Sequence, residues 1–160
     1  MQEWAVAVAM AVAMVGGARA SNLDVQGSWY TDDGMSIVEI QDCGDGTPCG
    51  SVTWLDPSID GDVCDENNPD LSLRHRRMMG LRLLEGFERG RGRWKSGAIY
   101  NPKNGQTYRA RLELLSNNQL GVSGCLGPIC KKFIWERAEP VGGDHLTDRK
   151  MRGSEDIASL

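Results

Sequence analysis

The sequence has few of the residues that carry most enzyme chemistry and most nucleic-acid binding. It contains only two histidines, and aromatic residues make up 6% of the chain. No Lys/Arg cluster extends beyond residues 74–77, and the formal net charge is -4. A nucleic-acid interface needs a basic face to neutralise phosphates, so nucleic acid is not expected as a partner. No serine lies in the Gly-x-Ser-x-Gly pattern of hydrolases; no catalytic residue is identified, and an enzyme is the less favoured class.

A long apolar run occurs at the N-terminus. Residues 5–15 are all apolar, Gly16-Gly17 ends the run, and Ala18-Arg19-Ala20 matches the pattern read by signal peptidase. This pattern predicts a signal peptide over residues 1–20, cleaved after Ala20, and a periplasmic or secreted location. The run is shorter than the roughly 20 residues that cross a bilayer, so no membrane span is expected.

The cysteines fit an oxidising compartment, since all five follow the predicted cleavage site. Cys43 and Cys49 flank one Gly/Pro turn, and Cys125 and Cys130 flank another. Each pair is expected to form a disulfide worth roughly 2 kcal/mol. Cys64 is left over. Zinc is the alternative, but neither pair has C-x-x-C spacing, so neither a metal nor another cofactor is expected.

Short segments of strand character follow one another along the chain, separated by Gly, Pro, Asn and Asp. Side chains alternate most clearly after Asn104-Gly105, where Ala110 and Leu112 share one face and Arg109 and Arg111 the other. This spacing predicts an all-β fold, a small antiparallel up-and-down barrel of about eight strands. The expected strands cover residues 27–31, 35–41, 50–55, 81–87, 94–100, 107–115, 119–125 and 131–138.

One long connection and one tail complete the chain. In residues 56–77, Asn68 as N-cap and Pro69 at the first helical position predict a short helix reaching Arg74. Polar residues 139–160 are predicted to be a disordered tail, which leaves residues 21–138 as a single domain. The acidic residues of the connection do not have EF-hand spacing and are interpreted as solvated carboxylates rather than calcium ligands. They are Asp56, Asp60, Asp62, Asp65, Glu66 and Asp70.

Two short patterns resemble the calycin barrels, the lipocalin-like group. Gly27-Ser28-Trp29 is similar to the G-x-W that begins the first barrel strand, and Trp135-Glu136-Arg137 lies on the expected last strand. The resemblance implies that Arg137 packs across Trp29 and closes one end of the barrel, where a cation above an indole is stabilised.

A longer resemblance, over residues 27–137, is to the bacterial domain of unknown function 2147. Its motifs occur in the order and spacing of that family. The chain departs from the family at Arg77, where the family usually has Pro, and at the additional Cys64. The resemblance implies export and a small barrel, with no established activity. The motifs are Gly27-Ser28-Trp29, Val38-Glu39-Ile40, Cys49-Gly50, Val52-Thr53-Trp54-Leu55, Asp65-Glu66-Asn67-Asn68-Pro69-Asp70, Arg74-His75-Arg76, Gly97-Ala98-Ile99-Tyr100-Asn101-Pro102 and Trp135-Glu136-Arg137.

Eight residues are candidates for a ligand site at the barrel mouth, under the long connection. The aromatic members would supply apolar contact, and the arginines would bind a carboxylate or phosphate. The Asp and Asn members could instead lock the connection against the barrel through caps and Arg forks, and this structural role is favoured. The candidates are Trp54, Asp65, Asn68, Asp70, Arg74, Arg76, Trp94 and Tyr100.

Three functions are weighed on this basis. The leading hypothesis is an exported module that binds a small amphipathic ligand at the barrel mouth. The alternative is an envelope protein-interaction module with a solid core, whose protein partner is unknown. A hydrolytic or redox enzyme using His75 or Cys64 ranks last. The first hypothesis is favoured by an empty barrel interior and the second by a filled one.

Overall fold

The computed structural model describes residues 23–59 and 63–139 as nine strands and one 3-10 helix. The predicted signal peptide and the predicted tail beyond Glu139 lie outside the described residues. Within the described part of the chain, no helix has the length and apolar character of a membrane-spanning segment. The elements are β1 (Gly27–Tyr30), β2 (Ser36–Asp42), β3 (Pro48–Leu55), η1 (Leu71–Leu73), β4 (Arg82–Glu85), β5 (Glu88–Arg89), β6 (Trp94–Asn101), β7 (Gln106–Ser116), β8 (Gln119–Leu126) and β9 (Ile129–Arg137).

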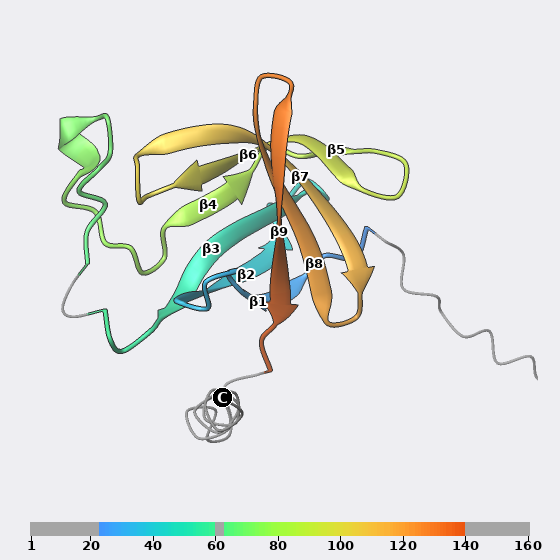
Figure 1. Cartoon of the computed structure of the whole chain (residues 1–160), viewed down its shortest axis with the longest axis horizontal. Helices are drawn as coiled ribbons and strands as arrows, with labels where there is room; N and C mark the ends of the chain where they lie inside the picture. Colours follow the sequence, from blue (N-terminus) through green and yellow to red (C-terminus); the bar gives the residue numbers. More distant parts are fainter. Residues whose placement is uncertain (1–22, 60–62, 140–160) are drawn as a thin grey trace, which may run out of the picture.

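Eight antiparallel strands close into a barrel (Figure 1). The sheet order is β4-β3-β2-β1-β9-β8-β7-β6-β5, and β4 also pairs with β6, which completes the ring and leaves the short β5 outside it. If β5 is left aside, each strand of the ring pairs with the strands that precede and follow it in the chain, and the first strand pairs with the last. The predicted all-β, up-and-down barrel of about eight strands is therefore confirmed.

Three local features differ from the sequence prediction. The segment Glu88–Arg89, which lies outside the expected strands, pairs with β6. β9 begins at Ile129 because the strand ladder continues through the cysteines, with Cys125 opposite Cys130 and Leu126 opposite Ile129. The expected helix is a single 3-10 turn whose N-cap is Asp70, not Asn68, and the Asp70 carboxylate accepts the Ser72 N–H at 2.9 Å.

Apolar side chains fill the barrel interior. On β7, Ala110 and Leu112 are fully buried, as the alternation predicts, and the alternating Arg109 and Arg111 are exposed. Packing is close, because a Cβ on Gly97 would come within 2.3 Å of the Phe87 ring. The interior therefore holds side chains where a hollow barrel would hold a ligand. The core also includes Trp29, Val38, Ile40, Val52, Leu84, Trp94, Leu120, Val122 and Trp135.

The two ends of the barrel differ in what covers them. At one end, which we call the closed end, the Arg137 guanidinium lies 4.1 Å from the centroid of the Trp29 ring. The Trp29 indole N–H donates to the carbonyl of Val25, and that of Trp94 to the carbonyl of Leu23. The segment before β1 therefore seals this end with its own backbone. At the other end, the mouth, lie the β1–β2, β6–β7 and β8–β9 turns and residues 56–81, which we call the mouth loop.

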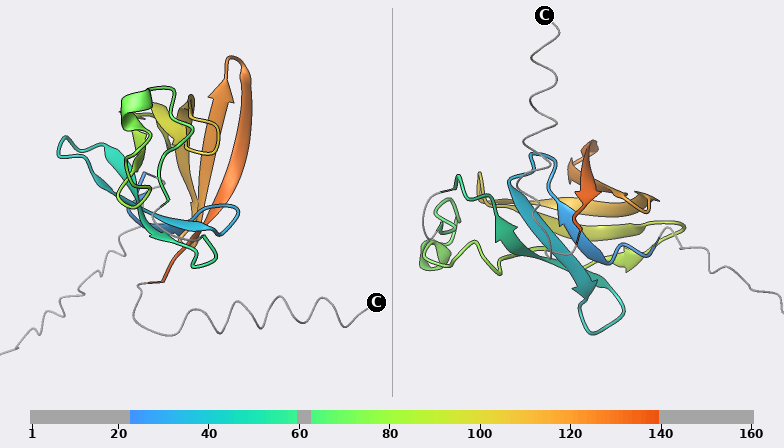
Figure 2. Two further views of the ribbon diagram at one scale, coloured as in Figure 1. Left: turned by 90° about the vertical axis from the view of Figure 1, so that its left-hand side faces the viewer. Right: turned by 90° about the horizontal axis from the view of Figure 1, so that it is seen from below.

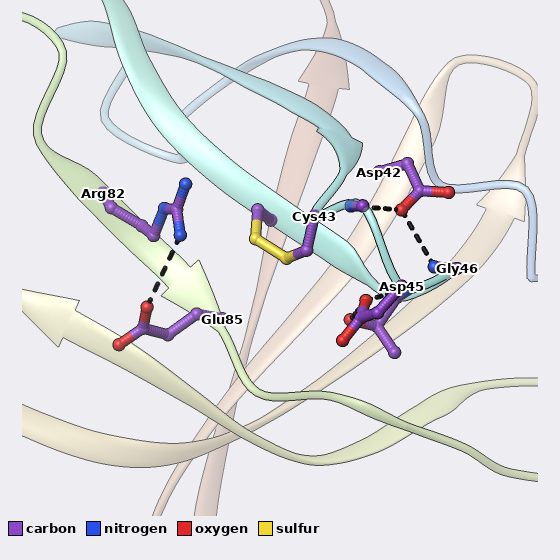
Figure 3. Close-up of a disulfide and its surroundings, with 9 residues drawn as sticks. Asp42, Cys43, Asp45, Gly46, Arg82 and Glu85 are labelled. Atoms are coloured by element: carbon purple, nitrogen blue, oxygen red, sulfur yellow. Dashed lines mark hydrogen bonds and ion pairs between the residues drawn. A yellow bond between two sulfur atoms is a disulfide. The ribbon is translucent and has the colours of Figure 1, made fainter.

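Both predicted disulfides are present, each in a turn between neighbouring strands. Cys43–Cys49 closes the β2–β3 turn at the closed end (Figure 3), and Cys125–Cys130 braces the β8–β9 hairpin at the mouth. The hairpin projects beyond its neighbours (Figures 1 and 2). Cys64 contributes to neither disulfide and forms an isolated bridge with Arg77.

Candidate functional site

A buried carboxylate holds the mouth loop in place. Asp65 is fully buried, and its Oδ1 accepts the Tyr100 hydroxyl at 2.6 Å. Its Oδ2 accepts the Asn68 amide at 2.7 Å and two guanidinium nitrogens of Arg76, at 2.9 and 2.7 Å. The loop thus meets β6 through a charged network in which both Asp65 oxygens accept hydrogen bonds. The interpretation of Asp65 as a solvated loop carboxylate is wrong, because its side chain is fully buried and hydrogen-bonded.

The electrostatics of the network favour an ionised Asp65. Burial alone would raise its pKa, but hydrogen bonds from Tyr100, Asn68 and Arg76 and the Arg76 charge outweigh burial and hold the pKa below its ordinary value. Burial and the contact with the carboxylate raise the pKa of the Tyr100 hydroxyl, which therefore stays a donor. The Arg76 guanidinium also lies 5.4 Å from the centroid of the Tyr100 ring.

Further contacts tie the mouth loop to the β6–β7 turn. The Asn67 amide donates to the carbonyls of Pro102 and Lys103, at 3.1 and 3.2 Å. The loop backbone comes so close that a Cβ on Gly105 would lie 1.9 Å from the Asn67 carbonyl oxygen, at a residue whose φ of 68° already favours glycine. Lys103 then reaches the β1–β2 turn through an ion pair of 2.5 Å with Asp33.

The predicted ligand residues fall into separate places. Asp65, Asn68, Arg76 and Tyr100 form one network. Arg74 adjoins it by donating to the Asn68 carbonyl at 2.8 Å, and Asp70 caps η1. Within the described residues, no buried side-chain nitrogen or oxygen lacks a hydrogen-bond partner. These polar groups bind one another, so the network serves as a brace for the loop.

Trp94 and Trp54 lie away from this network. Trp94 begins β6 at the closed end, at the opposite end of the strand from Asn101. Trp54 points to the outer face, because the pairing of β2 with β3 shifts between Ile37 and Val38. Val38 pairs with Val52 inside the barrel, whereas Ile37 pairs with Trp54 outside it.

A groove on this outer face has room for a small molecule. It has a volume of about 370 Å³ and runs over β1, β2 and β3 beside the end of β9. Trp54 and the buried Ile37 are its large apolar groups, and the Tyr30 ring meets Trp54 edge-on, with centroids 6.0 Å apart. The lining residues are Ser28, Ile37, Glu39, Thr53, Trp54, Ala138 and Glu139.

Charge in the groove has one sign. Glu39 and Glu139 are exposed carboxyl groups at its walls, and no Lys or Arg among the described residues lines it. Two carboxylates beside an indole face suit a positively charged group, since a cation gains from both the ring and the acids. The arrangement can hold an amphipathic cation with its apolar part against Trp54.

The sequence prediction missed all the groove residues except Trp54. On β1, the resemblance implies that Trp29 packs under Arg137 at one end of the barrel, so the neighbouring Ser28 could have been placed on the outer face. Ile37 could have been placed there too, because strict alternation puts it outside when Val38 is inside. Trp54 could not, because the sequence does not show which face it takes after the register shift. Ala138 and Glu139 reach the groove because the backbone continues past β9, where the Ala138 N–H donates to the Ser28 carbonyl at 2.8 Å.

His75 and Cys64 do not form a catalytic pair of side chains. His75 is exposed, and its contact with Cys64 is through its backbone carbonyl, 3.6 Å from the Cys64 sulfur. The part of the chain that the structure describes places no second histidine near them.

Comparison with known proteins agrees with this architecture. A solved structure described as "Protein HP1028 from the human pathogen Helicobacter pylori belongs to the lipocalin family" superimposes with a TM-score of 0.64 at 23% identity, covering 83% of this chain and 90% of that one. A search of curated proteins gives no significant match. The profile of a family described as "Uncharacterized protein conserved in bacteria (DUF2147)" matches residues 27–137, from the first strand of the barrel to the last. The chain therefore belongs to the DUF2147 family and has a lipocalin-like fold.

Proposed function

We propose that this protein binds a small amphipathic cation in the outer groove beside Trp54. The observation that carries the proposal is the groove itself, which joins an aromatic wall and an apolar floor to two carboxyl groups. Its volume of about 370 Å³ falls in the range of sites for small ligands. The lipocalin-like fold supports a binding role in general terms, because barrels of this size can serve small-ligand binding.

The groove is favoured over the mouth because the mouth arginines are already engaged. Arg76 is paired with Asp65, and Arg74 donates to the Asn68 carbonyl. A ligand carboxylate or phosphate at the mouth would have to compete with these contacts, and disruption of the Asp65 network would leave a buried charge without its partners. The ligand charge that we propose is therefore positive.

We also propose that the protein works outside the cytosol. The two disulfides support this location, because such bonds persist in oxidising compartments, and residues 1–20 have the pattern of a signal peptide. Fractionation of the native host, with N-terminal sequencing of the accumulated protein, tests it. A mature chain that begins at Ser21 outside the cytosol is expected, and an uncleaved cytosolic chain would contradict the proposal.

The binding proposal is tested with probes that share one alkyl chain and carry head groups of different charge. Octyltrimethylammonium, octyl glucoside and octyl sulfate, each used below its micellar concentration, share one apolar chain. We expect the ammonium probe to bind most tightly in a fluorescence or calorimetric titration and the sulfate most weakly. Trp54→Ala and Glu39→Gln should each weaken ammonium binding, and Glu88→Gln on β5, outside the groove, should not. Equal affinity for all three probes would remove the proposal.

A protein-interaction role is the second candidate, favoured by the filled interior. Buried Trp29, Leu112 and Trp135 occupy the space in which a hollow barrel would hold its ligand. Photo-cross-linking from an exposed strand position in intact cells, with the cross-linked product identified by mass spectrometry, tests this role. One reproducible partner together with no binding of any octyl probe would favour it over the groove.

A further inference from the structure

The tip of the β8–β9 hairpin exposes aliphatic side chains that contribute little to the core. Leu126 and Ile129 are 72% and 76% exposed, the highest values among the exposed large apolar residues of the described chain. They face each other as the last pair of the ladder, across the Gly127-Pro128 turn. Large apolar side chains grouped at a projecting tip, and not scattered singly over the surface, mark a contact surface.

Basic side chains surround this tip. One step down the ladder, Arg109 on β7 lies opposite Cys125, and Cys125 lies opposite Cys130. Three steps down, Arg111 lies opposite Ser123, which lies opposite Lys132. Lys131 lies between these levels, 4.9 Å from the centroid of the Phe133 ring.

Among the described residues, one acid pairs with the four cations behind the tip. Lys132 forms an ion pair of 3.1 Å with Glu113. The collar, defined as Arg109, Arg111, Lys131 and Lys132, therefore keeps a net positive charge just behind the apolar tip.

We propose that this hairpin docks the protein on an anionic lipid bilayer, with Leu126 and Ile129 entering the headgroup region and the collar binding lipid phosphates. The order of the groups fits a bilayer, since the apolar residues come first and the cations lie behind them at headgroup depth. The Cys125–Cys130 disulfide keeps the two strands together at the tip. The surface is separate from the Trp54 groove and does not depend on the function proposed there.

A bilayer suits this tip better than a protein partner does. A stable protein interface needs roughly 1,000 Å² of buried surface with aromatic anchors at its centre. The tip offers two aliphatic side chains and a proline, with no aromatic ring between residues 126 and 129. Small aliphatic area combined with several cations is instead the composition of a peripheral membrane contact.

Vesicle flotation tests the proposal with the full chain in the form that its host accumulates. We expect at least tenfold tighter binding to vesicles of phosphatidylcholine and phosphatidylglycerol at 7:3 than to phosphatidylcholine alone, and weaker binding as salt is raised. The double variant L126S/I129S should lose at least tenfold in affinity. Leu71→Ser is the matched control, because Leu71 is 67% exposed on η1, away from the hairpin, and its binding should equal that of the unaltered protein.

The collar has a matched control as well. R109Q/R111Q should weaken binding to the anionic vesicles several-fold and reduce its salt dependence. R91Q/R93Q removes two exposed arginines from the β5–β6 turn and should leave binding unchanged. All variants share one N-terminus, so any contribution from that segment cancels in these comparisons, and a circular dichroism spectrum confirms that each variant is folded.

Three outcomes would overturn the proposal. The first is equal or absent binding to the two vesicle types. The second is unchanged binding of folded L126S/I129S, and the third is an equal loss for Leu71→Ser. A photo-cross-linker at Ile129 that captures one protein in cells, from a chain that does not bind anionic vesicles, would assign the tip to a protein partner instead.

Discussion

The β2–β3 and β8–β9 turns are each braced by a disulfide, but the side chains around the two bonds differ. In the Cys43–Cys49 turn, one oxygen of Asp42 accepts the backbone N–H groups of Gly44 and Gly46, at 2.7 and 2.9 Å (Figure 3). In the Cys125–Cys130 turn, no carboxylate of the described residues plays this part, and Leu126 and Ile129 face solvent. The first turn is satisfied by its own side chains, whereas the second leaves apolar surface for something outside the barrel.

The mouth loop extends this comparison, because it is fixed without a disulfide. Asp65 draws Asn68, Arg76 and Tyr100 together from three parts of the chain. A covalent bond restrains the unfolded chain, while a buried carboxylate acts only after its partners have assembled. The three connections should therefore respond differently to mutation, reduction and pH.

The largest effect is expected at the noncovalent brace. Asp65→Ala leaves Arg76 without its partner and Tyr100 and Asn68 without their acceptor, so we expect a loss of about 3 kcal/mol in the free energy of unfolding. Urea denaturation measures it. Glu66→Ala changes the exposed neighbour and should cost less than about 0.5 kcal/mol. Similar losses for the two variants would show that the mouth loop does not depend on this network.

The disulfides should come next. C43A/C49A and C125A/C130A each open a short loop, and each should lower the free energy of unfolding by about 2 kcal/mol. Amide hydrogen exchange distinguishes the effects of the two variants, because the β8–β9 hairpin projects beyond the neighbouring strands. C125A/C130A should speed exchange near the tip while the core strands stay protected. Faster exchange throughout the barrel in that variant would contradict a local role for the hairpin bond.

Acid should affect the mouth loop through Asp65. Burial raises the pKa of Asp65, but its hydrogen bonds outweigh burial and hold the pKa below its ordinary value. The ionised carboxylate therefore stabilises the folded protein above about pH 4, and this stabilisation is lost as the pH falls through the lower folded pKa. Tyr100 acts in the other direction. Its raised pKa stabilises the fold below about pH 10, and this is lost as the pH rises through the higher folded pKa. Melting temperatures of Asp65→Asn should decline less in acid than those of the unaltered protein, and parallel curves would refute the assignment.

The smallest effects sharpen the contrast between the two turns. Asp42→Ala removes the acceptor of two backbone N–H groups and should cost about 1 kcal/mol, as loss of a helix cap does. Leu126→Ser should stay within about 0.5 kcal/mol, because its side chain is exposed. Paired urea denaturation curves measure both, and a costly Leu126→Ser would mean that the tip serves the fold rather than a contact.

Features that depend on neighbouring residues could be predicted from the sequence. The alternation around Ala110 and Leu112, and the turns between each cysteine pair, follow from local periodicity and turn chemistry. The closed ring of strands was expected for the same reason. The resemblance of Trp29 and Arg137 to the calycin pattern anticipated their contact, which the structure has at 4.1 Å.

The candidate site was harder to predict because it depends on register and distant partners. The shift between Ile37 and Val38 moves Trp54 to the outer face, and no composition signal marks such an irregularity. Asp65 is buried against Tyr100, which lies 35 residues away in the sequence. The residues next to Asp65 therefore do not reveal its burial. Strand direction alone would have separated Trp94 from Tyr100, since they stand near opposite ends of one eight-residue strand.

The seam between β1 and β9 sets the order in which the domain can be completed. Only Trp29–Arg137 and Tyr30–Glu136 pair there, so the first strand meets a partner made more than 100 residues later. A chain that emerges N-terminus first, from the ribosome or from an export channel, cannot finish its ring until residue 137 is available, however early β2 and β3 meet. Truncation shortly before Arg137 should therefore yield an open sheet with two exposed edge strands, and such a species is prone to aggregation.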